Sequence, residues 1–329
     1  MTTFNRRQFS HLLGAAAASS LLGRAAHAAP RTITVASLFG EDKPETKIWQ
    51  LIRDQVEKSL PGRFDFRIVQ NAALGGEKQV AEGIRLGSIQ ASLSTVSAVS
   101  SWVPDSQILD LPFLFKDRSH VRRALDGKLG QEFKDRFAAQ GFKVLGFINY
   151  GARHLLAKEA IATPAGISGK RIRVIQSPLH TELWKAYGAR PTAIPITETY
   201  NALKTGVVDA MDLAKSAYAG FKLHEVVPYL IETSHIWATG IVYVSQTFWK
   251  SLSEEEQAVF AAAGLQGARA FDDLIIADET TSVAAVTAAG GKVIPAQNLA
   301  EWRDGARKVW TQLAPSLGGL ERIEAIARS

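Results

Sequence analysis

The chain has 329 residues, of which 46% are hydrophobic and none is cysteine. Disulfides, thiolate nucleophiles and cysteine-ligated zinc or iron–sulfur sites are therefore excluded. The formal net charge is +6, but no run dense in lysine and arginine with interleaved aromatic residues occurs, so nucleic acid is not an expected partner.

The first 28 residues have the pattern of an export signal. The twin arginines Arg6 and Arg7 precede an apolar run of small residues, and Ala26–Ala28 forms an A-x-A cleavage element. This order predicts a twin-arginine signal peptide over 1–28 and a periplasmic mature protein. An amphipathic first helix is the alternative, but the segment has no acidic residue and its apolar part is too short to span a membrane. Loss of its three arginines leaves a net charge of +3.

Strand and helix patterns alternate after the signal. Stretches with a period of two predict strands over Thr32–Leu38, Phe64–Val69 and Ser88–Thr95. Apolar residues at helical spacing predict helices through Ile48–Val56 and Val80–Leu86. Strands separated by helices in this order imply parallel βαβ units with right-handed crossovers.

The alternation restarts after Gly151. It predicts strands over Gly169–Ile175 and Val207–Leu213, and helices over Pro178–Gly188 and Thr197–Gly206. The first of these helices has proline at its start and glycine at its end, as helix boundaries often do. The chain therefore contains a second α/β unit.

A last helical stretch runs from Ser253 to about Ala289. At about 1.5 Å per residue it is longer than one lobe is wide, so it is expected to cross both lobes. Two α/β units joined without a flexible linker suggest two lobes around a cleft. Ligands of open parallel sheets bind beyond the carboxyl ends of the strands. The loops of interest are Asn71–Lys78, Ser94–Ser97, Tyr150–His154, Arg173–Ser177 and Met211–Lys215.

No catalytic signature is present. The motifs GxSxG, HExxH and GxxxxGK[ST] are missing, and none of the five histidines after residue 28 lies at metal-ligand spacing from another. The acidic run Glu254–Glu256 starts a helix, so its carboxylates crowd a solvated first turn instead of forming an acid–base pair. We expect no catalytic residue, no metal and no cofactor, and a receptor explains the chain better than an enzyme does.

Several motifs in order resemble the solute-binding proteins of tripartite ATP-independent periplasmic (TRAP) transporters, the DctP-type family. The main one is "GKRIRVIQSPLHTELWKAYGARPTAIPITETYNALKTGVVDAMD", from Gly169 to Asp212. "ALGGEKQVAEGIRLGSI", "LDLPFLFKDRSHV" and "HIWATGIVYVSQTFWKSLSEEEQAVF" support it. The likeness covers Thr32 to about Ala289.

The resemblance implies a two-lobed α/β fold of the periplasmic-binding-protein type. Each lobe is expected to be a mostly parallel sheet flanked by helices, with a long helix along both and chain crossings between them. We predict lobe I over 29–150 plus 239–278 and lobe II over 151–238 plus 279–329. The family closes on a small organic-acid anion and delivers it to TRAP permease subunits in the membrane. We expect a monomer.

Two arginines match the family's ligand-binding arginines. Arg173 is the arginine of I-R-V, which pairs with the ligand carboxylate, and Arg153 belongs to the G-x-R segment Gly151–Arg153. A planar carboxylate fits the two-pronged guanidinium, so such a pair sets orientation as well as charge. From the residues alone, a solvated strand position is the favoured interpretation of Arg173.

The other candidates each have a plain structural alternative. Glu77 either accepts a hydrogen bond from a ligand or is an ordinary helix-start carboxylate. Ser94 and Thr95 end a strand expected to face the cleft, where short hydroxyls suit a carboxylate or polyol. Gln176 follows Arg173 in its loop, and Trp237 either covers the cleft or packs between the lobes.

The chain departs from the family after Asp209. The usual V-D-G-x-E-N is replaced by V-D-A-M-D-L, so Asp212 stands for the glutamate and Leu213 for the asparagine. Asp212 is kept as a candidate ligand contact, and the pocket near Leu213 is expected to be more apolar. An aliphatic, aromatic or simple sugar acid then fits better than a ligand like sialic acid. The alternative functions are an exported hydrolase or lyase acting on organic acids and the binding protein of an ABC-type importer.

Overall fold

The computed structural model describes residues 29–329, and the predicted signal peptide lies outside this part of the chain. The first βαβ units form as predicted, and the chain then adds several helices before a long strand. The elements are β1 (Arg31–Ala36), α2 (Pro44–Ser59), β2 (Phe64–Val69), α3 (Glu77–Leu86), β3 (Ala91–Thr95), α4 (Val96–Val99), the 3-10 helix η1 (Pro104–Asp110), α5 (Arg118–Asp126), α6 (Lys128–Ala139) and β4 (Phe142–Ala157).

The second half repeats the alternation and ends in helices. Its elements are α7 (Pro164–Ile167), β5 (Arg171–Val174), α8 (Pro178–Ala186), β6 (Arg190–Ala193), α9 (Ile196–Lys204), β7 (Ala210–Ala214), α10 (Lys215–Gly220), η2 (Leu223–Glu225), β8 (Tyr229–Ser245), α11 (Gln246–Lys250), α12 (Glu254–Ala288), β9 (Lys292–Pro295), α13 (Leu299–Leu313), η3 (Ala314–Ser316) and α14 (Leu320–Arg328). Two short edge strands, β6 and β9, were not predicted because four-residue segments carry little alternation.

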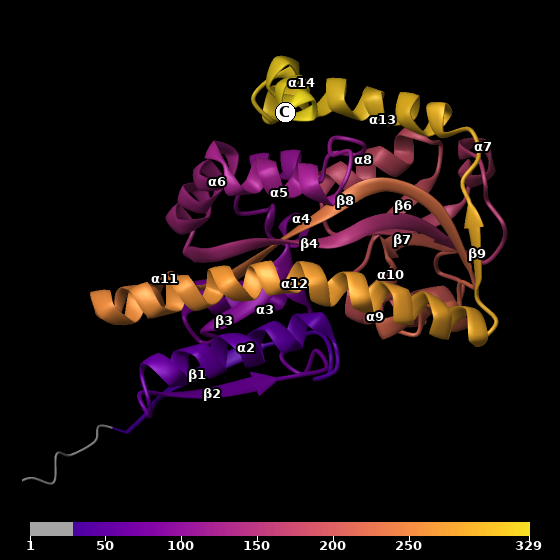
Figure 1. Ribbon diagram of the computed structural model, residues 1–329. Helices are drawn as coiled ribbons and strands as arrows, with labels where there is room; N and C mark the ends of the chain where they lie inside the picture. The colour runs from indigo at the N-terminus through magenta and orange to yellow at the C-terminus, as the bar shows by residue number, and fades with distance from the viewer. Residues whose placement is uncertain (1–28) are drawn as a thin grey trace, which may run out of the picture.

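All the described strands belong to one nine-stranded sheet with the order β2-β1-β3-β8-β4-β7-β5-β6, and β9 pairs with β8. The three strands at each end are parallel, as predicted for βαβ units. The central strands β4 and β8 are 16 and 17 residues long and pair antiparallel with each other. They run through the whole molecule (Figure 1), so a mixed sheet joins the two lobes of the predicted α/β fold.

The predicted lobe boundaries at 150/151 and 238/239 fall within β4 and β8. The pairing register of these strands shifts between Asn149 and Ala152, around Gly151. Gly151 has a φ of 95°, and a Cβ at this position would overlap the carboxylate of Glu279. A glycine is therefore required where the strands pass from one half to the other.

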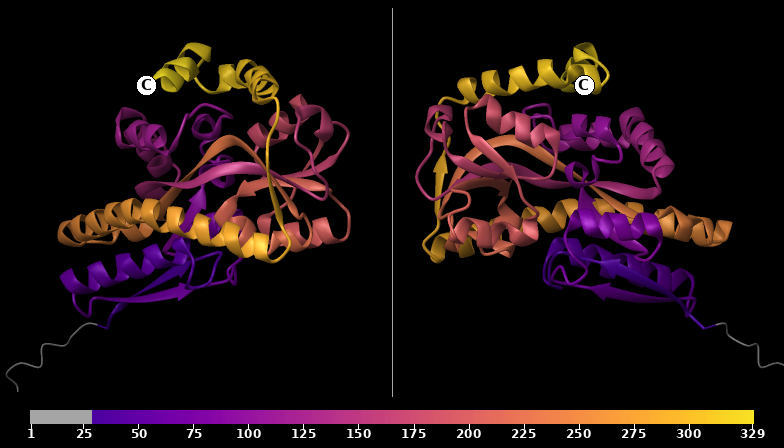
Figure 2. Two further views of the ribbon diagram at one scale, coloured as in Figure 1. Left: turned by 45° about the vertical axis from the view of Figure 1, so that its right-hand side comes forward. Right: turned by 180° about the vertical axis from the view of Figure 1, so that it is seen from behind.

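The long helix α12 confirms its prediction. A capping box between Ser253 and Glu256 starts it, and its 35 residues span roughly 50 Å at the rise of an α-helix. It packs on α2 in the first half, on β4, and on α10 in the second half, so it lies along both halves (Figure 1 and Figure 2).

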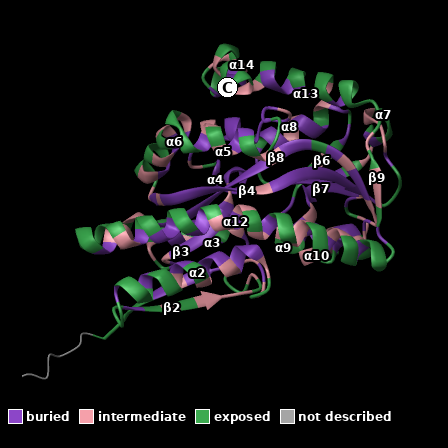
Figure 3. Ribbon diagram, viewed as in Figure 1, coloured by how far each residue is buried: buried purple, intermediate pink, exposed green. Residues whose placement is uncertain are grey.

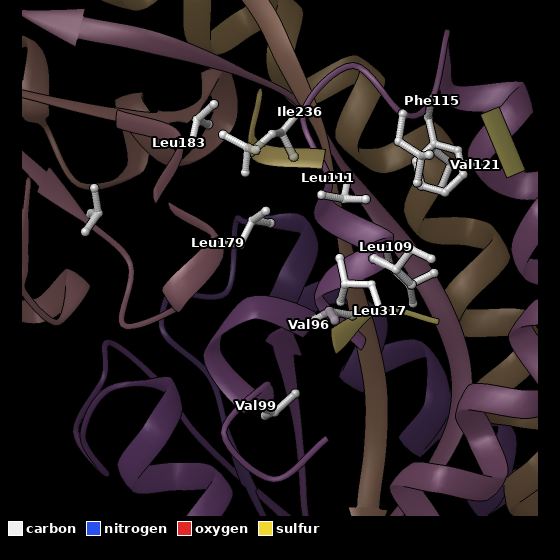
Figure 4. Packing of buried hydrophobic residues seen from close by; sticks show 14 of the residues in the cluster. Val96, Val99, Leu109, Leu111, Phe115, Val121, Leu179, Leu183, Ile236 and Leu317 are labelled. Atoms are coloured by element: carbon white, nitrogen blue, oxygen red, sulfur yellow. The ribbon is translucent and has the colours of Figure 1, made fainter. Parts of the chain in front are cut away.

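The buried side chains lie in clusters on the two faces of the sheet, with the exposed sides of the helices outward (Figure 3). The largest cluster includes Val96 and Leu109 from the first half and Leu179 and Leu183 from α8, close to one another (Figure 4). Hydrophobic packing is thus continuous from one half to the other on this face. On the opposite face, one cluster packs beneath α2 and α12 and another beneath α9 and α10.

Candidate functional site

Loops at the carboxyl ends of the parallel strands surround a cavity, as expected for such strands. The cavity volume is about 50 Å³, and the space between its walls is about 660 Å³ when the solvent at its open mouth is counted. Both halves of the chain contribute. The lining residues are Ala36, Ser37, Leu38, Phe39, Glu45, Glu77, Leu93, Thr95, Tyr150, Arg153, Arg173, Ile175, Ile196, Leu213, Ala214, Ala217, Phe221 and Ala238.

Arg173 lies in β5, directly beside Met211 of β7, and its side chain lines the cavity with only 2% of its surface exposed. Its Nε donates a hydrogen bond to the carbonyl oxygen of Ile194 at 2.8 Å. Within residues 29–329 its terminal nitrogens have no hydrogen-bond acceptor and no carboxylate within salt-bridge distance. Burial, with a contribution from nearby Arg153, lowers the pKa of Arg173 to about 10. The guanidinium is still charged at neutral pH.

Arg153 follows the glycine bend in β4 and is also buried, with 4% exposed. Its Nε and Nη2 donate to the side-chain Oδ2 and the main-chain oxygen of Asp212, each at 2.6 Å. Burial by itself would lower the pKa of Arg153, but the adjacent Asp212 outweighs it and the pKa is raised. Burial would likewise raise the pKa of Asp212, yet Arg153 and His235 hold it well below its usual range.

Two carboxylates face the same cavity. Glu77 is half-buried at the start of α3, and its Oε1 accepts a hydrogen bond from the backbone N–H of Thr95 at 2.5 Å. Burial raises the pKa of Glu77 despite this bond and the nearby arginines. Glu45, in the first turn of α2, is buried, and neither of its oxygens has a hydrogen-bond partner among the described residues. Burial raises the pKa of Glu45 to about 7.

Four of the predicted site residues line the cavity: Arg173, Arg153, Glu77 and Thr95. Thr95 also accepts a hydrogen bond from the N–H of Ala98, which caps α4. Leu213 lines the cavity as an apolar residue where the family has asparagine, so this side of the wall is apolar as expected.

The other four do not line this cavity, and the predicted direction of Ser94 is wrong. Successive strand residues point to opposite faces. Ser94 therefore points away from the cavity, and its Oγ lies 2.9 Å from the hydroxyl of Tyr243. Asp212 precedes Leu213 in β7, and its carboxylate is paired with Arg153 behind the wall.

Gln176 is exposed and borders only a smaller hollow that it shares with Arg173 and Glu77. Trp237 is half-buried, and the guanidinium of Arg118 lies 5.6 Å from the centre of its ring. It packs against the large hydrophobic cluster, so its position agrees with the packing alternative and not with a cleft cover.

Sequence reasoning missed the aromatic lining residues and Glu45. Phe39, after β1, and Phe221, after α10, bring their ring centres to 4.5 Å from each other across the two halves. Tyr150 of β4 also lines the cavity, and burial raises its pKa. Glu45 carried no signal, because a glutamate after proline at a helix start is a common solvated position.

A serine, a histidine and an aspartate meet behind the cavity in an arrangement that resembles a hydrolase triad. The Oγ of Ser97 is 3.0 Å from Nε2 of His180, whose Nδ1 is 3.9 Å from Oδ2 of Asp212. However, the single hydroxyl proton of Ser97 goes to Asp110 at 2.6 Å, so His180 must donate its Nε2–H to Ser97 and cannot act as its base. Burial also lowers the pKa of His180 to about 3. All four groups are buried and none lines the cavity.

Within 29–329 no helix is both long enough and apolar enough to cross a bilayer. In the same part of the chain, no three histidine, cysteine or acidic side chains are grouped so that they could hold a metal ion.

Comparison with known proteins places the chain among exported receptors. Residues 35–316 match the family model described as bacterial extracellular solute-binding protein, family 7. A solute-binding protein of Verminephrobacter eiseniae is 32% identical over 241 residues, 73% of this chain and 72% of the relative. The 2,3-diketo-L-gulonate-binding periplasmic protein of Escherichia coli is 28% identical over 73% of this chain and 74% of its own length.

A solved structure has the same fold. It is a TRAP periplasmic solute-binding protein from a Bradyrhizobium species, in complex with D-galacturonate. It superposes with a TM-score of 0.87 at 29% sequence identity, over 91% of this chain and 100% of the other.

Proposed function

Since this chain belongs to family 7 of the bacterial extracellular solute-binding proteins, we propose that it is a receptor that binds a small organic acid in the cavity between its halves. Arg173 binds the ligand carboxylate, and the loaded receptor delivers the acid to a TRAP permease. The named relatives support a sugar acid, because one binds 2,3-diketo-L-gulonate and the other was solved with D-galacturonate.

The observation that carries the proposal is the buried, unpaired guanidinium of Arg173. A buried charge is costly unless it is paired and hydrogen-bonded. Within residues 29–329, Arg173 has only the carbonyl of Ile194 as a partner, and its remaining donors face the cavity region. A ligand carboxylate supplies the missing charge and two acceptors in the geometry that a guanidinium prefers.

Binding then closes the two halves on each other. The cavity wall combines residues of both halves, and Phe39 meets Phe221 across them. An anion held between the halves makes its full contacts only in the closed state, so it shifts the population toward closure. The mature protein acts as a monomer in the periplasm after export by the twin-arginine signal, without nucleic acid as a partner. The proposed receptor performs no chemistry; the burial and the proton arrangement of the serine–histidine pair behind the wall support this.

A binding assay with D-galacturonate and D-glucuronate tests the proposal. Isothermal titration of wild-type protein should show binding, and Arg173→Gln should weaken it by about 30-fold to several thousandfold. The control is Arg171→Gln, two residues earlier in β5 but exposed and paired with Asp209. Equal affinities for wild type and Arg173→Gln would refute the role of Arg173. Recovery of a chemically altered acid after incubation would support the enzyme alternative.

A further inference from the structure

Glu45 is the buried group of the cavity wall that the proposed function leaves unexplained. Resting on that function, we propose that Glu45 accepts a hydrogen bond from a hydroxyl of the ligand, so that the receptor selects hydroxylated monocarboxylates over dicarboxylates.

The polar side chains next to Glu45 are hydrogen-bonded to other groups. The adjacent Lys43 is engaged with α12, its Nζ lying 3.0 Å from Asp278 Oδ2 and 3.2 Å from Ser282 Oγ. The next residue, Thr46, donates to the carbonyl of Phe39 and shares a 2.7 Å hydrogen bond with Ser37. The polar neighbours along α2 therefore satisfy one another and leave the carboxylate of Glu45 without a partner.

A buried carboxylate without a donor is destabilising for the protein that contains it. Glu45 is 4% exposed, and both oxygens are out of contact with solvent and without a protein donor in the described chain. The cost of this unpaired acceptor is removed when a bound molecule supplies the hydrogen-bond donor. Because Glu45 lines the cavity that Arg173 also lines, that donor belongs to the bound molecule.

The charges of the wall indicate which donor this is. Arg173 takes one carboxylate, and Arg153 is already neutralised by Asp212. Above pH 7, where Glu45 is mainly ionised, a second ligand carboxylate would face Glu45 and Glu77, and like charges in an interface cost several kcal/mol. An ammonium group would carry a larger desolvation cost than a hydroxyl into a wall made mainly of alanine, leucine, isoleucine and phenylalanine.

The test compares four acids in the intact mature protein: D-galacturonate, D-glucuronate, succinate and 4-aminobutyrate. Wild type should bind a uronate more tightly than succinate or 4-aminobutyrate. Glu45→Gln should weaken uronate binding about tenfold to a hundredfold, because one acceptor oxygen and its charge are lost. The same variant should bind succinate at least about tenfold more tightly than wild type does, because a like charge is removed.

Two further variants keep the test decisive. Glu41→Gln changes an exposed glutamate of the same segment and should leave all four affinities unchanged. Glu45→Asp retains the charge but withdraws the oxygens, so it should lose uronate affinity and still exclude succinate. Its binding decides the matter if Glu45→Gln does not fold.

The outcomes separate this inference from the proposed function. If wild type prefers succinate or 4-aminobutyrate and still depends on Arg173, the inference is overturned and the receptor function stands. Unchanged uronate affinity in Glu45→Gln also overturns the inference alone. If none of the four acids binds, the proposed function fails together with it.

Discussion

Arg153 and Arg173 lie on either side of β7, both are buried, and both line the cavity, yet they differ in what faces their charge. Arg153 has the carboxylate and the carbonyl of Asp212 at 2.6 Å. Arg173 has one main-chain carbonyl and, among residues 29–329, no acid within salt-bridge distance. As a result the pKa is raised for Arg153 and lowered, mainly by burial, to about 10 for Arg173.

The difference shows that a buried charge can either stabilise the fold or be available to a ligand. A pair that is complete within the protein stabilises the fold when both members are present and is destabilising when one is removed. A buried charge without a partner in the protein contributes little to the stability of the fold, but it is available to bind a ligand of opposite charge. Family resemblance alone treats both arginines as ligand contacts, whereas the geometry separates an arginine that is paired within the protein from one that has no acidic partner among residues 29–329.

The largest effect is expected when the buried Arg153–Asp212 pair is broken. Asp212→Asn removes the negative charge from a fully buried site and leaves Arg153 uncompensated, so the free energy of unfolding should fall by about 3–5 kcal/mol. Urea denaturation followed by circular dichroism measures it. Asp209→Asn, which opens a partly exposed pair with Arg171, is the matched control and should lose much less. Equal losses would show that the buried pair has no special role.

The next effect is a pH dependence that comes from Glu45. Its pKa rises from 4.5 unfolded to about 7 folded, chiefly through burial; Asp278 and Glu77 raise it further and Lys43 lowers it. Between these two values the folded protein holds a proton that the unfolded chain has released, so stability falls as pH rises toward 7 and stays lower above it. Glu45→Gln removes this titration, and its advantage over wild type should grow by roughly 3 kcal/mol between pH 4.5 and pH 8.

Urea denaturation of the ligand-free proteins at the two pH values measures this growth. Glu41→Gln is the control, because Glu41 is exposed and no pH-dependent advantage is expected from it. A difference between Glu45→Gln and wild type that is the same at both pH values would mean that Glu45 titrates normally.

A smaller effect concerns the aromatic contact between the halves. Phe221→Ala removes the partner of Phe39, and an aromatic pair of this kind contributes about 0.5–1.5 kcal/mol beyond its buried area. Release of D-galacturonate should be about two- to tenfold faster, measured by stopped-flow fluorescence. Phe66→Ala, which loses a stacking partner of Phe260 away from the cavity, should leave the release rate unchanged. An equal rate in Phe221→Ala would remove this contact from the closing mechanism.

The smallest effect on stability is expected when the charge of Arg173 is removed. Arg173→Met loses one hydrogen bond but also removes an uncompensated buried charge, so the unfolding free energy of the ligand-free protein should stay within about 1 kcal/mol of wild type. Arg153→Met, in contrast, should be destabilised as strongly as Asp212→Asn. The same urea experiment measures both. A large loss in Arg173→Met would make Arg173 a structural residue after all.

The sequence by itself determined most of the elements and indicated one residue of the cavity wall. Strong periodicity located β2 to the residue and the long helix α12 to within one residue at each end. The resemblance of I-R-V to the family motif singled out Arg173, and a strand that precedes a loop places its last residues at a known edge of a parallel sheet. The departure from the family motif at Leu213 likewise predicted an apolar wall.

Only the tertiary structure decided which side chains share the cavity and which charges are already paired. Arg153 and Asp212 are 59 positions apart, and Glu45 lines the same cavity as the two arginines only in the folded chain. Ser94 points away because the register of β3 with β8 sets its face, which the local pattern does not encode. Side-chain direction and charge compensation depend on contacts between distant segments, so they arise only when the two halves are assembled around the central strands.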